Sequence, residues 1–220
     1  FEGFRMRWSL CFAILVGMSQ SVTIVGAGLA GSEAALQLAD RGVRVRLVEM
    51  RPKTPTLVHV TGCCAELVCS NSLKSEKPDS AAGMLKRELA ELGSQLYAQA
   101  KLHAVPAGGA LAVDRTAFAE AVTALVEAHP LIDLVHEEVV DLVQAAEALV
   151  VAAGPLASDA LAASLSRLAG EEHLAFYDAA APIVMADSLD YAKLFRQSRY
   201  EDAAADAGDY LNAPVSRVEY

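Results

Sequence analysis

Apolar and polar residues follow one another along the start of the chain in the order expected for strand, helix and strand. The apolar run at 22–25 is short and uncharged, as is typical of a buried parallel strand. Small apolar residues then recur at helical spacing, at Ala34, Ala35, Leu38 and Ala39. The predicted helix ends at Gly42, and a second strand is predicted over 43–48, closed by Glu49. This order predicts a βαβ unit with two parallel strands.

The rest of the chain continues with helical and strand-like periods separated by turn residues. Helices are predicted over 81–102, 115–128 and 158–168. Short strands are predicted over 110–113, 131–135, 139–143 and 149–153. Three segments have little regular pattern: a loop over 51–71, a mixed loop and strand over 176–184, and a polar, irregular stretch over 187–220. The predicted fold class is therefore α/β, and a shift in composition after Gly154 suggests a domain boundary there.

A glycine-rich turn joins the first strand to the first helix, and it consists of Gly26, Ala27, Gly28, Leu29, Ala30 and Gly31. Gly26 permits a tight turn, Gly28 lets the backbone approach a pyrophosphate, and Gly31 lets the helix pack closely on the sheet. The helix N-terminus offers N–H groups to phosphates. Glu49 lies 18 residues after Gly31, where it can accept hydrogen bonds from ribose hydroxyls. The turn predicts a bound dinucleotide, FAD or NAD; the alternative is an ordinary glycine-rich turn without a ligand.

Composition supports a folded core and limits the partners. The chain has 220 residues, of which 54% are hydrophobic, enough for one large domain or two small ones. Its net charge of −10 argues against a broad nucleic-acid surface but leaves room for a local basic patch. The basic residues that could contact RNA phosphates, although a solvated face is their more common role, are Arg41, Arg44, Arg46, Arg51 and Lys53.

The cysteines indicate a reducing compartment. Cys11, Cys63, Cys64 and Cys69 include no CxxC pair, so neither a zinc site nor a disulfide framework is predicted. We therefore expect a cytoplasmic protein.

The first 17 residues do not fit the fold that follows. An apolar run over 8–16 comes after Arg5 and Arg7, but it is too short to span a bilayer, and we expect no membrane partner. Met18 lies four residues before Val22, close to where a dinucleotide-binding fold begins. We expect residues 1–17 to be foreign to the native protein; an export signal is the alternative.

Five longer stretches together resemble one protein family. They lie at 23–35, 48–52, 65–73, 105–115 and 176–184, with shorter matches at 198–200 and 210–212. Over about 21–220 the chain is similar to the folate- and FAD-dependent tRNA (uracil-5-)-methyltransferases. The resemblance implies an FAD-binding, Rossmann-like domain of the glutathione-reductase type over 18–154, and the start of an inserted α/β substrate domain over 155–220. It further implies FAD as cofactor, NAD(P)H as reductant, methylenetetrahydrofolate as carbon donor, and the T-loop uridine of tRNA as substrate.

The resemblance also implies roles for particular residues. Cys69, in the sequence Leu-Val-Cys-Ser-Asn-Ser, matches the reactive cysteine of the family; taken alone, it could equally be a small packing residue. The glycine turn and Glu49 would hold FAD. Arg115 could contact flavin or phosphate, whereas its neighbour Asp114 could simply cap the next helix. Cys63 and Cys64 replace a charged and an aromatic residue of the family and are expected to be incidental.

Some features keep other readings open. A full-length relative would be about twice as long, so the chain could be an inactive nucleotide-binding fragment. Another flavin oxidoreductase of the same fold is possible, such as an enzyme that modifies the wobble uridine of tRNA. Cys64 and Cys69 have the CxxxxC spacing of a disulfide reductase, but in the wrong place relative to the second strand.

Overall fold

The computed structural model describes residues 21–142, 148–170, 184–197, 208–214 and 216–217. These described residues fall into two compact units that interleave along the chain. Unit 1 takes its residues from 1–66 and 119–179, and unit 2 from 67–118 and 180–220. The single boundary expected near Gly154 stays a prediction, as does the foreign origin of residues 1–17, which lie outside the described part.

Unit 1 is built on a parallel sheet of four strands, β1 (Ser21–Val25), β2 (Arg44–Glu49), β6 (Ile132–His136) and β7 (Ala148–Val151). Their order is β6-β2-β1-β7, and every pairing is parallel. Strands β2 and β6 therefore lie on one side of β1 and β7 lies on the other, and this is the strand order of a Rossmann-like fold. Ile24 and Leu47 are fully buried in the two central strands because their apolar side chains face packed helices.

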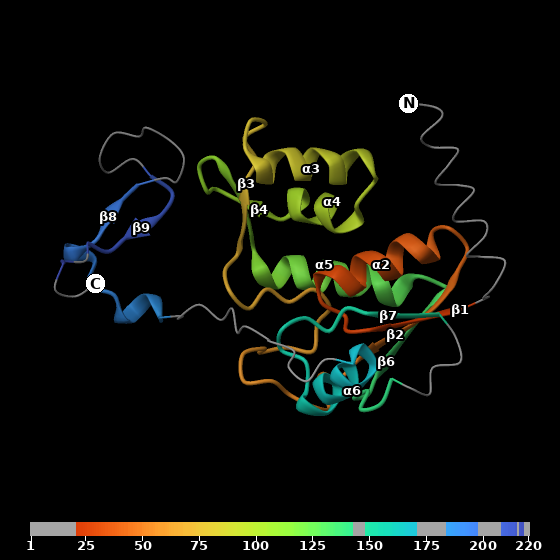
Figure 1. Cartoon of the computed structure of the whole chain (residues 1–220). Helices are drawn as coiled ribbons and strands as arrows, with labels where there is room; N and C mark the ends of the chain where they lie inside the picture. The colour runs from red at the N-terminus through yellow and green to blue at the C-terminus, as the bar shows by residue number, and fades with distance from the viewer. Residues whose placement is uncertain (1–20, 143–147, 171–183, 198–207, 215, 218–220) are drawn as a thin grey trace. The chain divides into compact units, whose positions relative to one another are not determined.

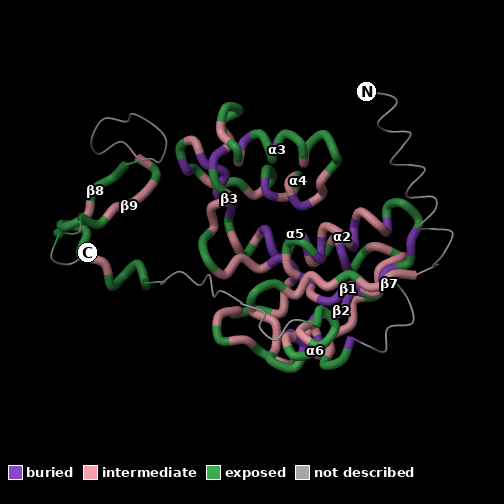
Figure 2. Tube along the Cα trace, in the orientation of Figure 1, coloured by how far each residue is buried: buried purple, intermediate pink, exposed green. Residues whose placement is uncertain are grey.

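Helices pack on both faces of this sheet (Figure 1). Helix α2 (Leu29–Ala39) contacts β1 and β2, and it buries Leu36 together with small residues at 31, 32, 35 and 39 (Figure 2). Helix α6 (Asp159–Ala169) packs Leu161 against Val25 at the end of β1. The βαβ unit and the α/β class expected from the sequence are thus confirmed.

Unit 2 contains an antiparallel sheet in the order β3-β5-β4, with β3 at Ser72–Ser75, β4 at Ala104–Val105 and β5 at Ala110–Val113. Helices α3 (Ala81–Glu91) and α4 (Gln95–Leu102) lie between β3 and β4 in the chain. Helix α5 (Arg115–Ala128) begins in unit 2 and continues into unit 1. Later residues form the short helices η1 (Ala186–Ser188) and η2 (Tyr191–Lys193), and a hairpin of β8 (Phe195–Arg196) and β9 (Leu211–Asn212).

Two predicted elements are wrong. The helix expected over 81–102 is two helices, because Gly93 adopts a φ of +72° and the Ser94 hydroxyl accepts the Tyr97 N–H to start α4. The strand expected over 139–143 is not a strand at 139–142. There Leu142 donates its N–H to the Ser164 hydroxyl on α6. The prediction over 176–184 falls almost wholly outside the described residues. Across the described part of the chain, no helix is long and apolar enough to cross a membrane.

Candidate functional site

The glycine turn between β1 and α2 leaves no room for side chains at two of its three glycines. Gly26 has a φ of +99°, and a Cβ there would lie 2.7 Å from the Ala152 carbonyl oxygen. A Cβ on Gly31 would lie 1.8 Å from the Gly26 carbonyl oxygen. Gly28 differs, since a Cβ there would meet no heavy atom within 4 Å. The turn therefore packs tightly at both ends and opens to free space at Gly28, where the sequence predicted a close approach of phosphate.

Helix α2 begins at this turn without a side-chain cap. Its N-cap residue is Gly28, which accepts only the backbone N–H of Ser32, at 3.0 Å, as its first helical bond. Helices α3, α4 and α6 are instead capped by the serines that precede them. The N–H groups in the first turn of α2, at Leu29, Ala30 and Gly31, have no intrahelical acceptor and carry the positive end of the helix dipole. This helix end is suited to an anion.

Glu49 ends β2 beside the turn, and its carboxylate is buried. Its Oε2 accepts the N–H of Ala27 at 2.8 Å, while its Oε1 accepts the N–H and Nε of Arg51 at 3.1 and 2.8 Å. Burial alone would raise the pKa of Glu49, but the hydrogen bonds from Arg51 and Ala27 and the charge of Arg51 outweigh it and hold that pKa below its ordinary value. The side chain is therefore a carboxylate at neutral pH, with lone pairs left for further donors.

A pocket opens at the carboxyl edge of the parallel sheet, next to Glu49. It is lined by the ends of β1 and β2, the loops after β6 and β7, and the start of α6. Its acidic lining residues are Glu49, Glu137 and Glu138. No Lys or Arg is among its described lining residues, but Glu49 is paired with Arg51 and Glu137 with Arg46. This is the edge at which parallel α/β sheets bind ligands. The carboxylate oxygens of the lining can accept hydrogen bonds from hydroxyl groups.

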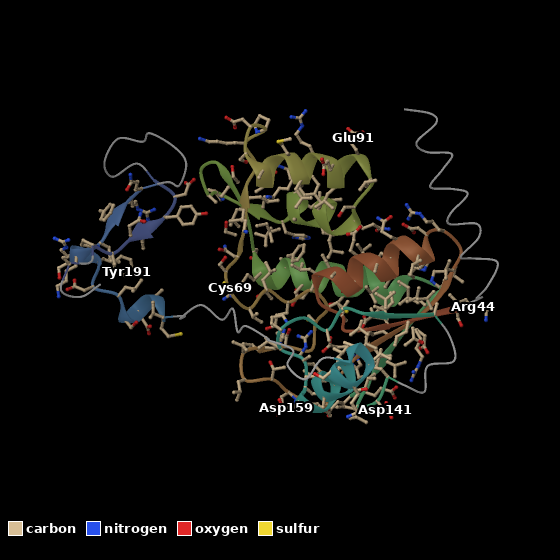
Figure 3. All side chains as sticks on the ribbon, in the orientation of Figure 1. Arg44, Cys69, Glu91, Asp141, Asp159 and Tyr191 are labelled. Atoms are coloured by element: carbon tan, nitrogen blue, oxygen red, sulfur yellow. The ribbon has the colours of Figure 1, made fainter. Side chains whose placement is uncertain are left out.

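Arg51 does not belong to an exposed basic patch. Its side chain is 4% exposed and bonds to Glu49 and to Glu66, the latter through Nη1 and Oε2 at 3.1 Å. The hypothesis that Arg51 contacts RNA phosphates is therefore wrong, because its guanidinium is buried between two carboxylates. Arg46 is paired with Glu137, and Arg44 is exposed on β2 (Figure 3). Glu66 was not predicted from the sequence. It lies in the stretch 65–73 that resembles the family, but its spacing from Glu49 and Arg51 matches no known motif.

Cys69 lies in unit 2, on the exposed loop that leads into β3 (Figure 3). Bonds on both sides hold this loop: Arg115 Nη1 donates to the Leu67 carbonyl at 3.2 Å, and Asn71 exchanges two hydrogen bonds with Val113 of β5. Cys69 itself is exposed and free. The structure thus places Cys69 in a fixed, accessible loop.

Asp114 and Arg115 have different local roles. The Asp114 carboxylate accepts the N–H groups of Thr116 and Ala117, each at 3.0 Å, and so caps α5, as the sequence predicts. Arg115 is half-buried and contacts the loop of Cys69 through Leu67. Its predicted contact with flavin or phosphate stays a prediction.

Cys64 is a packing residue. It is 1% exposed, and its backbone N–H donates to the Thr123 hydroxyl at 2.8 Å. Burial raises the pKa of its thiol to about 11, so the group is protonated at neutral pH. Cys63, Cys64 and Cys69 are all free, and the burial and raised pKa of Cys64 make it a poor member of a disulfide-reductase pair. Among the described residues, no group of three or more His, Cys, Asp or Glu side chains is arranged to hold a metal ion.

Three sets of comparisons bear on this site. The family model described as "Glucose inhibited division protein A" matches residues 21–220. A protein of Syntrophomonas wolfei named "Methylenetetrahydrofolate--tRNA-(uracil-5-)-methyltransferase TrmFO" is 55% identical over 201 residues, which cover 91% of this chain and 45% of that protein. A protein of the same name from Geobacter sulfurreducens is 55% identical over 203 residues, covering 92% and 46%. A solved structure of GidA from Aquifex aeolicus has a TM-score of 0.46 at 20% identity, covering 56% of this chain and 20% of that one, too weak a likeness to support an argument.

The chain spans somewhat less than half the length of these curated relatives. The family match nevertheless extends over all of the described residues, including the glycine turn, Glu49 and Cys69. The chain therefore belongs to the glucose inhibited division protein A family.

Proposed function

We propose that this chain holds FAD at the glycine turn and Glu49. In the whole protein, we propose, it contributes to methylation of C5 of the T-loop uridine in tRNA. Methylenetetrahydrofolate would donate the carbon and NAD(P)H the electrons. The observation that carries the proposal is the joint geometry of an uncapped helix end, an open Gly28 and an ionised Glu49. The names of relatives that are 55% identical to the chain support the choice of reaction.

The described residues fit the adenosine diphosphate part of FAD. The first turn of α2 would bind the pyrophosphate, and Glu49 would accept hydrogen bonds from the ribose hydroxyls. Because FAD would occupy this site, NAD(P)H is proposed as a transient reductant that binds elsewhere. When bound, flavin supplies the electrons that convert a methylene group into a methyl group.

Cys69 is proposed as the nucleophile that activates uracil. Uracil C5 becomes a carbon nucleophile when a thiolate adds to C6, because the electron pair of the C5–C6 double bond then moves to C5 and the C4 carbonyl. C5 would then attack the methylene carbon of the folate donor, and loss of the C5 proton with cleavage of the carbon–nitrogen bond would release tetrahydrofolate. A hydride supplied by reduced flavin would complete the methyl group as the thiolate leaves C6, which restores the double bond and the free cysteine. The exposure of Cys69 on a loop held by Arg115 and Asn71 supports this role.

A second candidate is a nucleotide-binding unit that is inactive by itself. It is favoured by one observation, that the chain covers 45% and 46% of the length of its curated relatives. The two candidates share the FAD site and differ in whether residues 21–220 suffice for methyl transfer. For both, we propose the cytoplasm as the place of action, where tRNA, reduced folate and free thiols occur together.

The test is to express the complete reading frame that contains this chain, and separately residues 18–220, and to assay both. The first should carry FAD, seen as a flavin absorption spectrum, and should convert T-loop uridine to 5-methyluridine with methylenetetrahydrofolate and NADPH. Activity of the complete protein alone would support the second candidate for the shorter chain. A complete protein that carries FAD but leaves the T-loop uridine unmodified would contradict the proposed reaction.

A further inference from the structure

The loop that follows β2 is closed at its base by a buried ion pair. Arg51 begins the loop and Glu66 ends it, and they meet through Nη1 and Oε2 at 3.1 Å. Arg51 also donates to the Thr61 carbonyl at 3.3 Å. Glu66 accepts the N–H groups of Val60 at 2.8 Å and Thr61 at 3.1 Å. Glu66 therefore holds the returning half of the loop as well as its base.

The guanidinium of Arg51 also holds the carboxylate of Glu49. Its Nε lies 2.8 Å from Glu49 Oε1, while its Nη1 serves Glu66, so one planar group joins two carboxylates. We call Glu49, Arg51 and Glu66 the clasp. All three side chains are almost buried, with 7%, 4% and 12% of their surfaces exposed. Without Glu66, the guanidinium would keep Glu49 and the Thr61 carbonyl as partners but would lose the second carboxylate that fixes its orientation, so the geometry of Glu49 depends on Glu66 through Arg51.

A second set of bonds joins the same loop to the glycine turn. The N–H of Ala65 donates to the Ala27 carbonyl at 2.8 Å, and the N–H of Ala27 donates to Glu49 at 2.8 Å. Ala65 is fully buried, whereas Leu57 near the loop tip is fully exposed. The base of the loop is thus hydrogen-bonded to the turn that is proposed to bind the pyrophosphate, whereas the tip of the loop is exposed.

We propose that Arg51 and Glu66 are positioning residues of the nucleotide site. They fix the carboxylate of Glu49 for the ribose, and they couple nucleotide binding to closure of the 51–66 loop. The inference rests on the proposed FAD site. A preorganised carboxylate binds ribose hydroxyls more tightly than one that must first be ordered. Because coupling is reciprocal, bound FAD must in turn favour the closed loop.

The experiment compares Glu66→Gln with wild type in the complete protein, and Glu76→Gln serves as a matched control. Glu76 accepts from Tyr97 at 3.1 Å and from Lys101 at 3.0 Å, but it has no part in the clasp. FAD titration gives the dissociation constant. Hydrogen exchange gives the protection of the Val60, Thr61 and Ala65 amides with and without FAD. In wild type, FAD should slow exchange of these amides at least tenfold.

Glu66→Gln should weaken FAD binding five- to fiftyfold and abolish most of the FAD-dependent protection, with exchange in β1 unchanged. Glu76→Gln should alter neither quantity. If Glu66 were merely structural, Glu66→Gln would change the amide exchange rates equally with and without FAD, and the folded variant would bind FAD as tightly as wild type. That result would overturn the proposal. The second variant is Arg51→Lys, which keeps the positive charge but loses the planar guanidinium. It too should weaken FAD binding at least fivefold. Wild-type affinity for FAD in Arg51→Lys would overturn the proposal.

The same experiment distinguishes failure of this coupling from failure of the proposed FAD site. If wild type binds FAD and Glu66→Gln binds it equally well with undiminished loop protection, the coupling is wrong and the FAD site stands. If wild type binds neither FAD nor ADP, both the site and the coupling are wrong.

Discussion

At the scale of single residues, the glycine turn combines two kinds of glycine. Gly26 and Gly31 are required by packing, since a Cβ on either would come within 3 Å of backbone atoms. Gly28 has free space around it and a φ of −70°, which any residue can adopt. Packing therefore explains the first two glycines, whereas the third fits both its N-cap position and the close approach of a ligand.

This difference gives a prediction with an internal control. Gly31→Ala should destabilise the fold by about 2 kcal/mol or more, because the new Cβ would lie 1.8 Å from the Gly26 carbonyl oxygen, although alanine normally favours a helix. Gly28→Ala, at an N-cap where glycine is preferred to alanine, should cost less stability, about 1 kcal/mol, but weaken FAD binding at least tenfold. Urea unfolding and FAD titration measure the two effects. Wild-type affinity in Gly28→Ala would contradict the phosphate site.

A second prediction concerns Cys69, whose thiol is exposed and free. Cys69→Ser should keep FAD affinity and melting temperature but lower methyl transfer at least a hundredfold, because a hydroxyl is a poor nucleophile at neutral pH. Cys63→Ser is the matched control, a neighbouring free cysteine with no proposed role, and should stay near wild-type activity. A Cys69→Ser protein with full activity would contradict the assignment.

At the scale of elements, the boundaries of the helices were harder to predict from the sequence than their presence. The helical spacing over 81–102 predicted one helix, but Gly93 and the Ser94 cap divide it. A helical period does not reveal such a break, because capping depends on one or two residues rather than on a period. The run at 139–143 looked like a strand for a similar reason, since Leu142 is apolar and buried but bonded to Ser164 instead of to a strand.

The start of α5 offers a test of capping at this scale. Asp114→Ala removes the acceptor of the Thr116 and Ala117 N–H groups and should cost about 1 kcal/mol of stability, whereas Asp114→Ser should recover most of it. Urea unfolding at neutral pH provides the measurement. FAD affinity should be the same in both variants, and a large loss of affinity in Asp114→Ser would instead give this carboxylate a part in binding.

At the scale of the whole molecule, the sequence predicted the parallel sheet, its βαβ start and the position of Glu49, because these follow from local periods and from a motif of fixed spacing. It did not predict the clasp. Arg51 and Glu66 are 15 residues apart, and nothing in a one-dimensional pattern indicates that a charged pair closes an irregular loop and is buried there. The division into interleaved units, with residues 67–118 inserted within unit 1, was missed for the same reason.

The buried carboxylates predict how stability depends on pH. The pKa values of Glu49 and Glu66 are lowered from 4.5 in the folded protein, because hydrogen bonds outweigh the effect of burial. As pH falls below about 4.5, the unfolded chain takes up protons that the folded protein still excludes, so the free energy of unfolding decreases; above that pH this contribution is fully present. Urea unfolding at pH 6, 5, 4 and 3.5 should follow this course, with a shallower decrease in Glu66→Gln. An equally steep decrease of the free energy of unfolding in Glu66→Gln would contradict a lowered pKa of Glu66 in the folded protein.

The central claim is that FAD binds at the glycine turn and Glu49. The most direct measurement is an equilibrium titration of FAD into the apoprotein of the complete reading frame, wild type against Glu49→Ala, with folding checked by circular dichroism. We predict that wild type binds FAD and that folded Glu49→Ala binds it at least tenfold more weakly, because the ribose loses its carboxylate partner. Equal affinity of the two folded proteins for FAD would contradict the claim.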